Sequence, residues 1–309
     1  MCHADGMSER HDEPSMTKLH ARLPILTLWV ARAAWLAVPL GASSIIGAVQ
    51  SDALRVRLEV LAWAIWTMVA AALLLARPLG LTAIRLSIAA GAWLCGALLL
   101  RGEPLPLWAL ALIPVALILL SRPLADELIN GKSYGSELRF ALRLPPAIAL
   151  IGIPLSGLAW AGIAIGINYA FERDLFVAAA VLIPSATVAW LTTPSAHRMS
   201  ERFLVFVPAG CVVSDPTALL DPVLMPGSHL RSVGSERDAA SQLPGVASLD
   251  LRAGTVFGAL RFRFTRPGRV AAKETLGGVM EVEELLITPA RTVAFMDAAR
   301  TRRVLNAKA

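Results

Sequence analysis

The sequence predicts an integral membrane α-helical bundle of six transmembrane helices that carries a cytoplasmic β-rich domain. Hydrophobic residues make up 56% of the 309 residues and charged residues 17%, against roughly 25% charged residues in an average soluble protein. Uncharged stretches of about 17–26 residues recur up to residue 193, and a helix of that length crosses the ~30 Å hydrocarbon core of a bilayer. After residue 195 the pattern changes to short alternating runs between glycine and proline residues.

Residues 1–22 precede the first apolar stretch and are predicted to form a disordered cytoplasmic tail, because they are polar and show no apolar periodicity. The apolar stretch that follows is longer than the core of a secretory signal peptide, which spans about 7–15 residues, and it lacks a small-x-small cleavage site. We therefore expect it to remain as an uncleaved signal anchor.

The membrane domain is predicted to cover residues 23–194. Its six spans are expected within residues 23–49, 59–76, 81–100, 105–121, 145–170 and 175–193. Arginine–proline pairs end the second and the fourth span, and a charged Glu-Arg-Asp break separates the last two. Residues 122–144, between the fourth and the fifth span, are predicted to form a cytoplasmic loop.

The distribution of basic residues predicts the orientation, because cytoplasmic flanks of membrane helices carry an excess of lysine and arginine. With the N-terminus inside, the inner segments hold eleven basic residues and the outer loops four. The inner ones are Arg10, Lys18, Arg22, Arg77, Arg85, Arg122, Lys132, Arg139, Arg143, Arg198 and Arg202, and the outer ones are Arg55, Arg57, Arg101 and Arg173. We expect a multi-pass protein of the bacterial inner (plasma) membrane with both termini in the cytoplasm.

Within the spans, no acidic, basic or histidine side chain falls in the middle of an apolar stretch. The pair Gly162 and Gly166 has the spacing that lets membrane helices approach closely, either inside the bundle or between copies in a homo-oligomer. Prolines in four spans leave open a transport or channel function. That alternative requires a polar cavity, for which the candidate lining residues are Ser156, Asn168, Ser185 and Thr187.

Residues 195–309 are predicted to form the cytoplasmic β-rich domain. Seven short strands are expected at residues 202–207, 210–215, 221–226, 229–234, 248–253, 258–264 and 279–287. A closing helix follows, with Thr288 as its cap and Pro289 in its first turn. Its apolar stripe would consist of Val293, Phe295, Met296 and Ala299.

Seven strands closed by one helix is also the order of elements in pleckstrin-homology (PH) domains, and residues 202–305 resemble the bacterial PH-like families. In that resemblance "LMPGSHLRSVG" is a strand–turn–strand, and "LLITPARTVAFMDAARTR" is the last strand and the helix. PH domains that bind phosphoinositides carry basic residues around the first hairpin, whereas the turn here is an uncharged Pro-Ala-Gly. The resemblance therefore does not imply that kind of headgroup binding.

The combined layout is similar to an uncharacterised actinobacterial family of multi-pass membrane proteins. The similarity lies in the segments "NGKSYGSELRFALRLPP" and "ERFLVFVPAGCVVSDPTALLDPVLMP". It implies no activity, because that family has none to transfer.

The "NGKS" at residues 130–133 ends like a phosphate-binding P-loop, but the glycine that such a loop needs five positions before Gly131 is replaced by Asp126. A carboxylate there would repel phosphate, so the segment is interpreted as a turn. In "LRFALRL", which follows, leucine and phenylalanine alternate with Arg139 and Arg143. The alternation favours a strand, although a surface-lying helix stays open. In either form we expect these two arginines to face phosphates or the β domain.

A second basic segment, "RFRFTRPGRVAAK", is predicted to place its cations on one strand face and in the turn after it. These cations are Arg261, Arg263, Arg266, Arg269 and Lys273. On a domain tethered to a membrane they would contact anionic lipid headgroups or a protein partner. A solvated strand face remains an alternative interpretation. No nucleic acid is expected, because the segment lacks the pattern of a base-reading module.

Enzyme signatures are missing, and neither a cofactor nor a metal is predicted. The leading hypothesis is a scaffolding or interaction protein that presents a basic β domain to anionic lipids or a protein partner. A membrane-embedded, lipid-modifying enzyme is a further alternative. Its candidate carboxylates are Asp126, Glu127 and Glu137 in the segment between the fourth and fifth spans.

Overall fold

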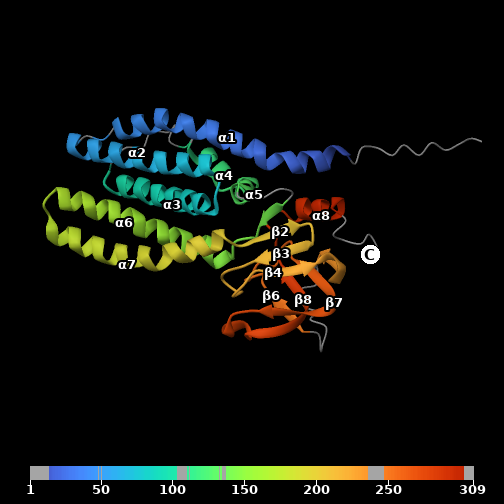
Figure 1. Cartoon of the computed structure of the whole chain (residues 1–309). Helices are drawn as coiled ribbons and strands as arrows, with labels where there is room; N and C mark the ends of the chain where they lie inside the picture. The colour runs from blue at the N-terminus through green and yellow to red at the C-terminus, as the bar shows by residue number, and fades with distance from the viewer. Residues whose placement is uncertain are drawn as a thin grey trace, which may run out of the picture.

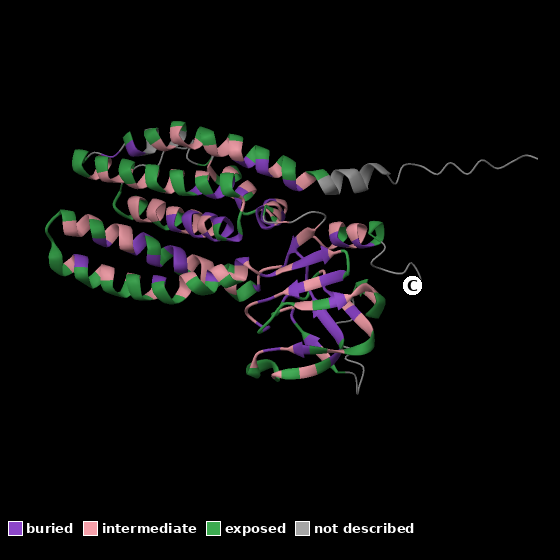
Figure 2. Cartoon of the chain, viewed as in Figure 1, coloured by how far each residue is buried: buried purple, intermediate pink, exposed green. Residues whose placement is uncertain are grey.

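The computed structural model describes residues 14–47, 49, 51–102, 110, 112–131, 133, 137–235 and 247–302. Long helices form a bundle beside two small β-sheets (Figure 1). Buried residues concentrate in the sheets, whereas exposed and half-buried residues line the bundle along its length (Figure 2). Large apolar side chains are among the exposed ones on the helices, for example Phe176 and Trp190. Such a surface is suited to lipid and not to water.

Five helices among the described residues are long and apolar enough to cross a membrane. They are α1 (Pro14–Gly47), α2 (Asp52–Leu75), α3 (Pro78–Leu100), α6 (Ile153–Phe171) with the short π-helix η2 (Ile148–Gly152) before it, and α7 (Leu175–Ser200). They coincide with five of the six predicted spans. α1 begins at Pro14, inside the predicted tail of residues 1–22, and residues 1–13 lie outside the described residues.

The predicted fourth span, residues 105–121, falls partly on residues 103–109 and 111, outside the described part of the chain. Its described part contains α4 (Leu112–Leu119), eight residues and therefore about 12 Å long. The predicted loop at residues 122–144 contains a helix, α5 (Arg122–Asn130), and a strand, β1 (Leu138–Ala141). The extended interpretation of the arginine segment is thus confirmed for residues 138–141.

Helix α6 packs against both α3 and α7. Gly162 and Gly166 lie against α7, where a Cβ on either glycine would contact Ser185 or Leu182. Gly157, one turn earlier, lies against the backbone of α3 at Ala89. The small residues of α6 therefore serve close packing inside one bundle.

Polar groups also join the first two helices. The indole nitrogens of Trp35 and Trp66 each donate a hydrogen bond, 2.9 Å long, to the other residue's carbonyl oxygen. The guanidinium of Arg32 donates to the carbonyl of Leu73 at 2.9 Å. This carbonyl belongs to the last turn of α2, where backbone acceptors lack partners within the helix and attract cations.

The two sheets have four strands each. The first sheet, in the antiparallel order β1-β2-β3-β4, adds β2 (Phe203–Val207), β3 (Gly210–Ser214) and β4 (Val223–Pro226) to β1. The second, in the order β5-β7-β8-β6, contains β5 (Leu230–Ser235), β6 (Ser248–Asp250), β7 (Leu260–Ala271) and β8 (Val279–Ile287). β6 runs parallel to β8, and the other pairs are antiparallel. All seven strands predicted within residues 195–309 are present. The eighth strand, β1, comes from the segment before α6 and pairs with β2.

The closing helix is α8 (Thr292–Thr301), which starts later than predicted. Thr288 does not cap it. Instead, residues 288–290 extend alongside the chain that follows β1, with hydrogen bonds from Arg143 N to Thr288 O and from Ala290 N to Ala141 O. Of the predicted apolar stripe, Phe295 and Ala299 are buried, whereas Val293 is 64% exposed. The ring of Phe295 fills the centre of the core, against Phe140, Phe206 and Phe262.

Gly157 provides a test of the helix packing. An alanine Cβ at residue 157 would lie 2.7 Å from the carbonyl carbon of Ala89, so Gly157→Ala must displace α6 from α3. We expect a loss of about 1–3 kcal/mol, as for overpacked cores, seen as a lower melting temperature in detergent. Gly91→Ala in α3 is the control, because a Cβ there meets nothing within 4 Å. Equal melting temperatures for the two variants would contradict this packing.

Candidate functional site at the junction of the bundle and the sheets

Helix α5 connects the bundle to the first sheet. Its apolar side chains are buried in one cluster with residues of α1, α2 and α3, and Ala141 and Ala290 from the sheet side belong to the same cluster. The buried members on α5 are Leu124, Ala125, Leu128 and Ile129. The sheets are therefore packed onto the end of the bundle and are not merely tethered to it.

The "NGKS" turn has a structural role at this junction. The side chain of Asn130 donates to the carbonyl of Arg139 and accepts from the amide of the same residue, both at 2.7 Å. Gly131 packs on the carbonyl of Ala76, in the turn between α2 and α3, with no space for a side chain. Lys132 lies outside the described residues.

Asp126 also holds β1 in place. Its side chain is buried, Oδ1 accepts a hydrogen bond from the amide of Ala141 at 2.8 Å, and Oδ2 lies 3.4 Å from Nη1 of Arg291. Burial raises the pKa of this carboxyl from 3.8 to about 7, and it outweighs the opposing effects of the Ala141 amide and the Arg291 cation.

A cavity of about 240 Å³ opens beside these groups, between α1, α5, β1 and α8. Its charged lining residues are Asp126, Arg139, Arg291, Asp297 and Arg302. The guanidinium of Arg139 pairs with Glu137 at 3.0 Å and lies over the ring of Phe203. The lining holds both cations and carboxylates, so its charge favours neither anions nor metal ions. No group of three potential metal-ligating side chains occurs among the described residues.

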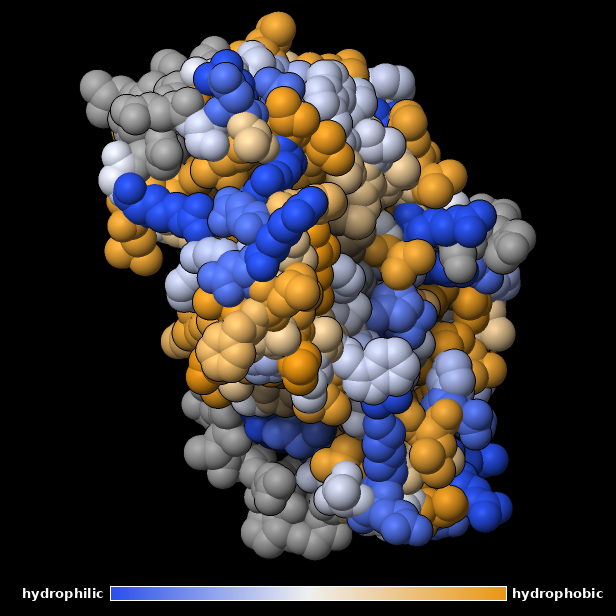
Figure 3. Space-filling view, turned by 90° about the vertical axis from the view of Figure 1, so that its left-hand side faces the viewer, coloured by the Kyte–Doolittle hydropathy of each residue, from blue (hydrophilic) through white to orange (hydrophobic). Residues whose placement is uncertain are grey.

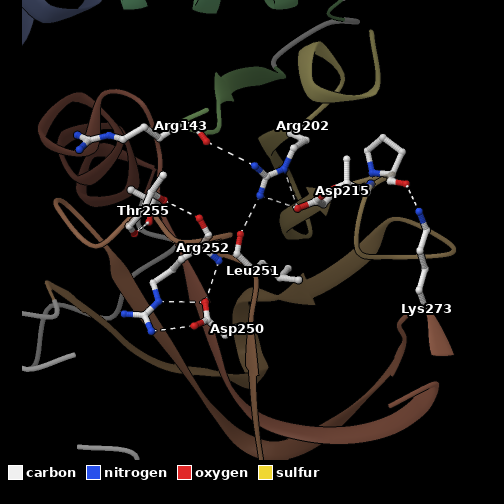
Figure 4. A network of polar contacts seen from close by, with 11 residues as sticks. Arg143, Arg202, Asp215, Asp250, Leu251, Arg252, Thr255 and Lys273 are labelled. Atoms are coloured by element: carbon white, nitrogen blue, oxygen red, sulfur yellow. Dashed lines mark hydrogen bonds and ion pairs between the residues drawn. The ribbon is translucent and has the colours of Figure 1, made fainter. Parts of the chain in front are cut away.

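A buried ion pair fixes the second connection between bundle and sheets. Arg202, just after α7, donates through Nε and Nη2 to Oδ2 of Asp215, at 2.9 and 2.8 Å (Figure 4). The same guanidinium donates to the carbonyls of Leu251 and Arg143. Both charged side chains are at most 2% exposed. Because the partners of Arg202 come from both sheets and from the segment before α6, this network holds those three parts together.

Arg143, one of the predicted contact residues, differs from the other arginines of the junction. Its guanidinium lies beside Gly258 and makes no side-chain hydrogen bond or ion pair with the described residues, and its Nε is buried without a partner. Burial and the nearby Arg122 lower the pKa of Arg143. An unpaired guanidinium at this position is a candidate anion-binding group.

The loop next to Arg143, residues 252–258, presents two apolar side chains. Phe257 is 83% exposed and Val256 is 54% exposed. The loop backbone is nevertheless well held, because Thr288 donates to the carbonyl of Thr255 and Thr292 to that of Gly258. Sequence reasoning missed this loop, whose signal was the dipeptide Val-Phe between two glycines.

The predicted basic patch on β7 is partly neutralised. Arg261 and Arg263 both pair with the buried carboxylate of Glu284 on β8, at 3.6 and 2.7 Å. Lys273 donates to the carbonyl of Pro216 at 2.9 Å. Arg266 and Arg269 are exposed. Arg266 lies where the register of β7 against β8 shifts, and Arg269 lies opposite Glu281.

The carboxylates that would serve a lipid-modifying enzyme lie near different cations. Asp126 pairs with Arg291, Glu137 pairs with Arg139, and Glu127 is subject to the field of Arg32. These contacts give no support to a single acid–base centre.

The polar residues suggested for a transport cavity do not converge either. The hydroxyls of Ser156 and Thr187 donate to carbonyls one turn earlier in their own helices. The side chain of Asn168 bonds Arg57 and Glu172 at the opposite end of the bundle. No hydrogen bond joins these side chains among the described residues, and they give no support to a transport function.

Asp126 predicts a pH-dependent stability. Because its pKa is about 7 in the folded chain and 3.8 otherwise, the folded state retains a proton that the unfolded state has lost. Stability should therefore fall as the pH rises from about 4 to about 7. Asp126→Asn cannot ionise, so its melting temperature in detergent should vary less over this range. Asp221→Asn, at an exposed aspartate, is the control and should keep the wild-type profile; a wild-type profile for Asp126→Asn would contradict the assignment.

The buried ion pair predicts a large mutational effect. Asp215→Asn leaves the guanidinium of Arg202 buried without a counter-charge, which typically costs about 3–5 kcal/mol. Asp250→Asn is the matched control, because Asp250 pairs with Arg252 while its own side chain is 46% exposed, and such pairs contribute roughly 0–1 kcal/mol. Melting temperatures in detergent should separate the two variants clearly. A similar decrease in melting temperature in both variants would show that burial of the ion pair contributes little to stability.

Comparisons with protein-family models, with curated proteins and with solved structures give no match to this chain. The resemblances to PH-like domains and to actinobacterial membrane proteins therefore remain predictions, and a function has to be inferred from the geometry of the junction.

Proposed function

We propose that the chain is a scaffolding or interaction protein of the bacterial inner membrane. In this proposal six membrane crossings hold a PH-like β domain on the cytoplasmic side, against the headgroups of anionic lipids. The observation that carries the proposal is Arg143, an arginine without a side-chain partner at the point where the sheets meet the bundle.

The course of the chain supports six crossings. α3 ends at the end of the bundle away from the sheets, whereas α5 begins beside the sheets (Figure 1). Leu100 and Arg122 thus lie at opposite ends of the bundle, which supports a sixth crossing in addition to the five long helices. The first turn of α1 and the end of α8 both lie on the side of the sheets (Figure 1), which supports the placement of both termini on one side of the membrane.

Chain length supports contact between the sheets and the headgroups. Helix α7 has 26 residues and is therefore about 39 Å long, enough to cross the ~30 Å hydrocarbon core and enter the headgroup region. Only Glu201 and Arg202 separate α7 from β2, and two extended residues reach at most about 7 Å. The headgroup region is itself about 5–7 Å deep on each side, so the sheets begin within or directly below it.

In this proposal Arg143 lies at the depth of the lipid headgroups. It is three residues before the helical turn at residue 146 that leads into η2 and α6. An arginine at this depth can donate to lipid phosphate in two parallel hydrogen bonds. Anionic lipids attract such cations by about 1 kcal/mol per residue. Arg266 and Arg269 on β7 are exposed cations that add to this attraction, whereas Arg261, Arg263 and Lys273 are engaged within the domain.

A protein partner is the second candidate, favoured by the exposed Phe257 and Val256 on a well-held loop. Exposed aromatic side chains on a rigid support are common anchors of protein interfaces. A crosslinking pull-down from the native membrane tests this candidate, with Phe257→Ser as the control that should lose the partner.

The lipid contact is tested with the full-length chain in nanodiscs of phosphatidylcholine, with and without phosphatidylglycerol. Hydrogen exchange of residues 252–258 is the readout, because Gly258 adjoins the guanidinium of Arg143. We expect slower exchange in the anionic bilayer. Arg143→Gln should abolish the difference, whereas Arg300→Gln, which removes a 70% exposed arginine on α8, should retain it. Identical exchange in both bilayers would contradict the lipid contact.

A further inference from the structure

A groove of about 390 Å³ runs between α2, α3 and α6 at the end of the bundle away from the sheets. Its volume lies within the range of roughly 300–1,000 Å³ that is usual for small-ligand sites. Its lining is almost wholly apolar and includes Val60, Ala64, Leu94, Leu98 and Ile165. Figure 3 looks onto this end of the molecule, where hydrophilic side chains lie among hydrophobic ones.

The groove arises from the helix packing. α3 packs against α2 on one side and against α6 on the other, so α2 and α6 form the two walls and α3 the floor. All three helices are candidate membrane spans. The opening therefore faces the bilayer, and hydrocarbon is the medium that an apolar groove at this depth would take up.

Two arginines lie at the outer end of the groove. Arg57 of α2 donates through Nη1 to Oδ1 of Asn168 at 2.8 Å and to Glu172 at 3.2 Å. Arg101, which caps α3, donates through Nη2 to the hydroxyl of Tyr169 at 3.1 Å, and its guanidinium stacks over that ring. Arginines from two helices are thus both held against the end of α6.

The outer end of the groove suits phosphate, because it has two cations, of which, among the described residues, only Arg57 is paired with a carboxylate, that of Glu172. Arg57 and Arg101 line it, and no carboxylate does. Each guanidinium uses one nitrogen in the contacts described, and the other nitrogens remain for a ligand. Planar guanidinium groups match phosphate oxygens well. An acyl chain along the apolar walls would place its phosphate at this end, because the groove lies between three candidate spans and its outer end is near the helix ends, where the headgroup layer begins.

We propose that this groove binds one phospholipid, with an acyl chain between α2 and α6 and the phosphate held by Arg57 and Arg101. The site lies at the opposite end of the bundle from Arg143 and does not depend on the proposed contact of the β domain. Phosphate is the group that is recognised, so a diacyl lipid without phosphate should bind weakly.

Native mass spectrometry of the full-length chain in detergent tests the site, with added phosphatidylglycerol or an equal amount of diacylglycerol. We expect one bound phosphatidylglycerol, retained at least about tenfold better than diacylglycerol, because only the phospholipid offers a phosphate to the two guanidinium groups and hydrogen bonds to charged groups are strong. Arg101→Gln should reduce this preference and leave diacylglycerol binding unchanged.

Ala64→Phe fills the groove and should remove the bound lipid. Ala71→Phe is the matched control, because Ala71 is also exposed on α2 but does not line the groove; it should retain the lipid. Unchanged melting temperatures would show that both variants fold. The proposal is overturned if the wild type retains no phospholipid, if both lipids bind equally, or if the two variants behave alike. It is also overturned if Ala64→Phe instead separates a dimer, because the occupant would then be a second copy.

Discussion

One edge of strand β1 has no neighbouring strand among the described residues, and side chains of helix α5 supply its hydrogen-bond partners. These contacts determine how the sheets are joined to the bundle. One edge of β1 pairs with β2. At the other edge, Asn130 bonds both backbone groups of Arg139, and Asp126 accepts from the amide of Ala141. An unpaired strand edge would attract other chains. Here a helix at the end of the bundle covers it, so the sheet cannot be complete without the membrane part.

The same junction removes several charges from water, and each is compensated differently. Arg202 and Asp215 form a close pair with further carbonyl partners, as a buried ion pair requires. Asp126 pairs with Arg291 at 3.4 Å and accepts from the amide of Ala141, but burial outweighs both contacts and raises its pKa to about 7. The guanidinium of Arg143 has no hydrogen-bond or ion-pair partner among the described residues. This graded compensation distinguishes arginines that stabilise the fold from one that is available to a ligand.

The arginines at the two ends of the bundle show that the position of a cation decides its availability to a ligand more than the number of cations nearby. Of the five cations predicted for the basic segment, Arg261 and Arg263 form ion pairs with the carboxylate of Glu284. A third, Lys273, donates a hydrogen bond to a backbone carbonyl. At the opposite end, Arg57 and Arg101 are drawn together over an apolar groove by side chains of α6 and of the turn after it. Both proposed lipid contacts therefore involve cations next to the membrane, whereas the strand with the densest positive charge is mostly self-compensated.

Local patterns in the sequence were sufficient for five long membrane helices and seven strands, because apolar length and alternation reflect burial directly. They also argued against a nucleotide site at "NGKS", because Asp126 stands where a glycine is needed. Only the tertiary structure decided that residues 138–141 belong to the sheet, that Glu284 neutralises Arg261 and Arg263, and that Thr288 lies in an extended segment and not at a helix cap. These outcomes depend on partners 21 to 145 residues away in the chain, from Arg263 and Glu284 to Arg143 and Thr288, and such long-range pairing leaves no local signature.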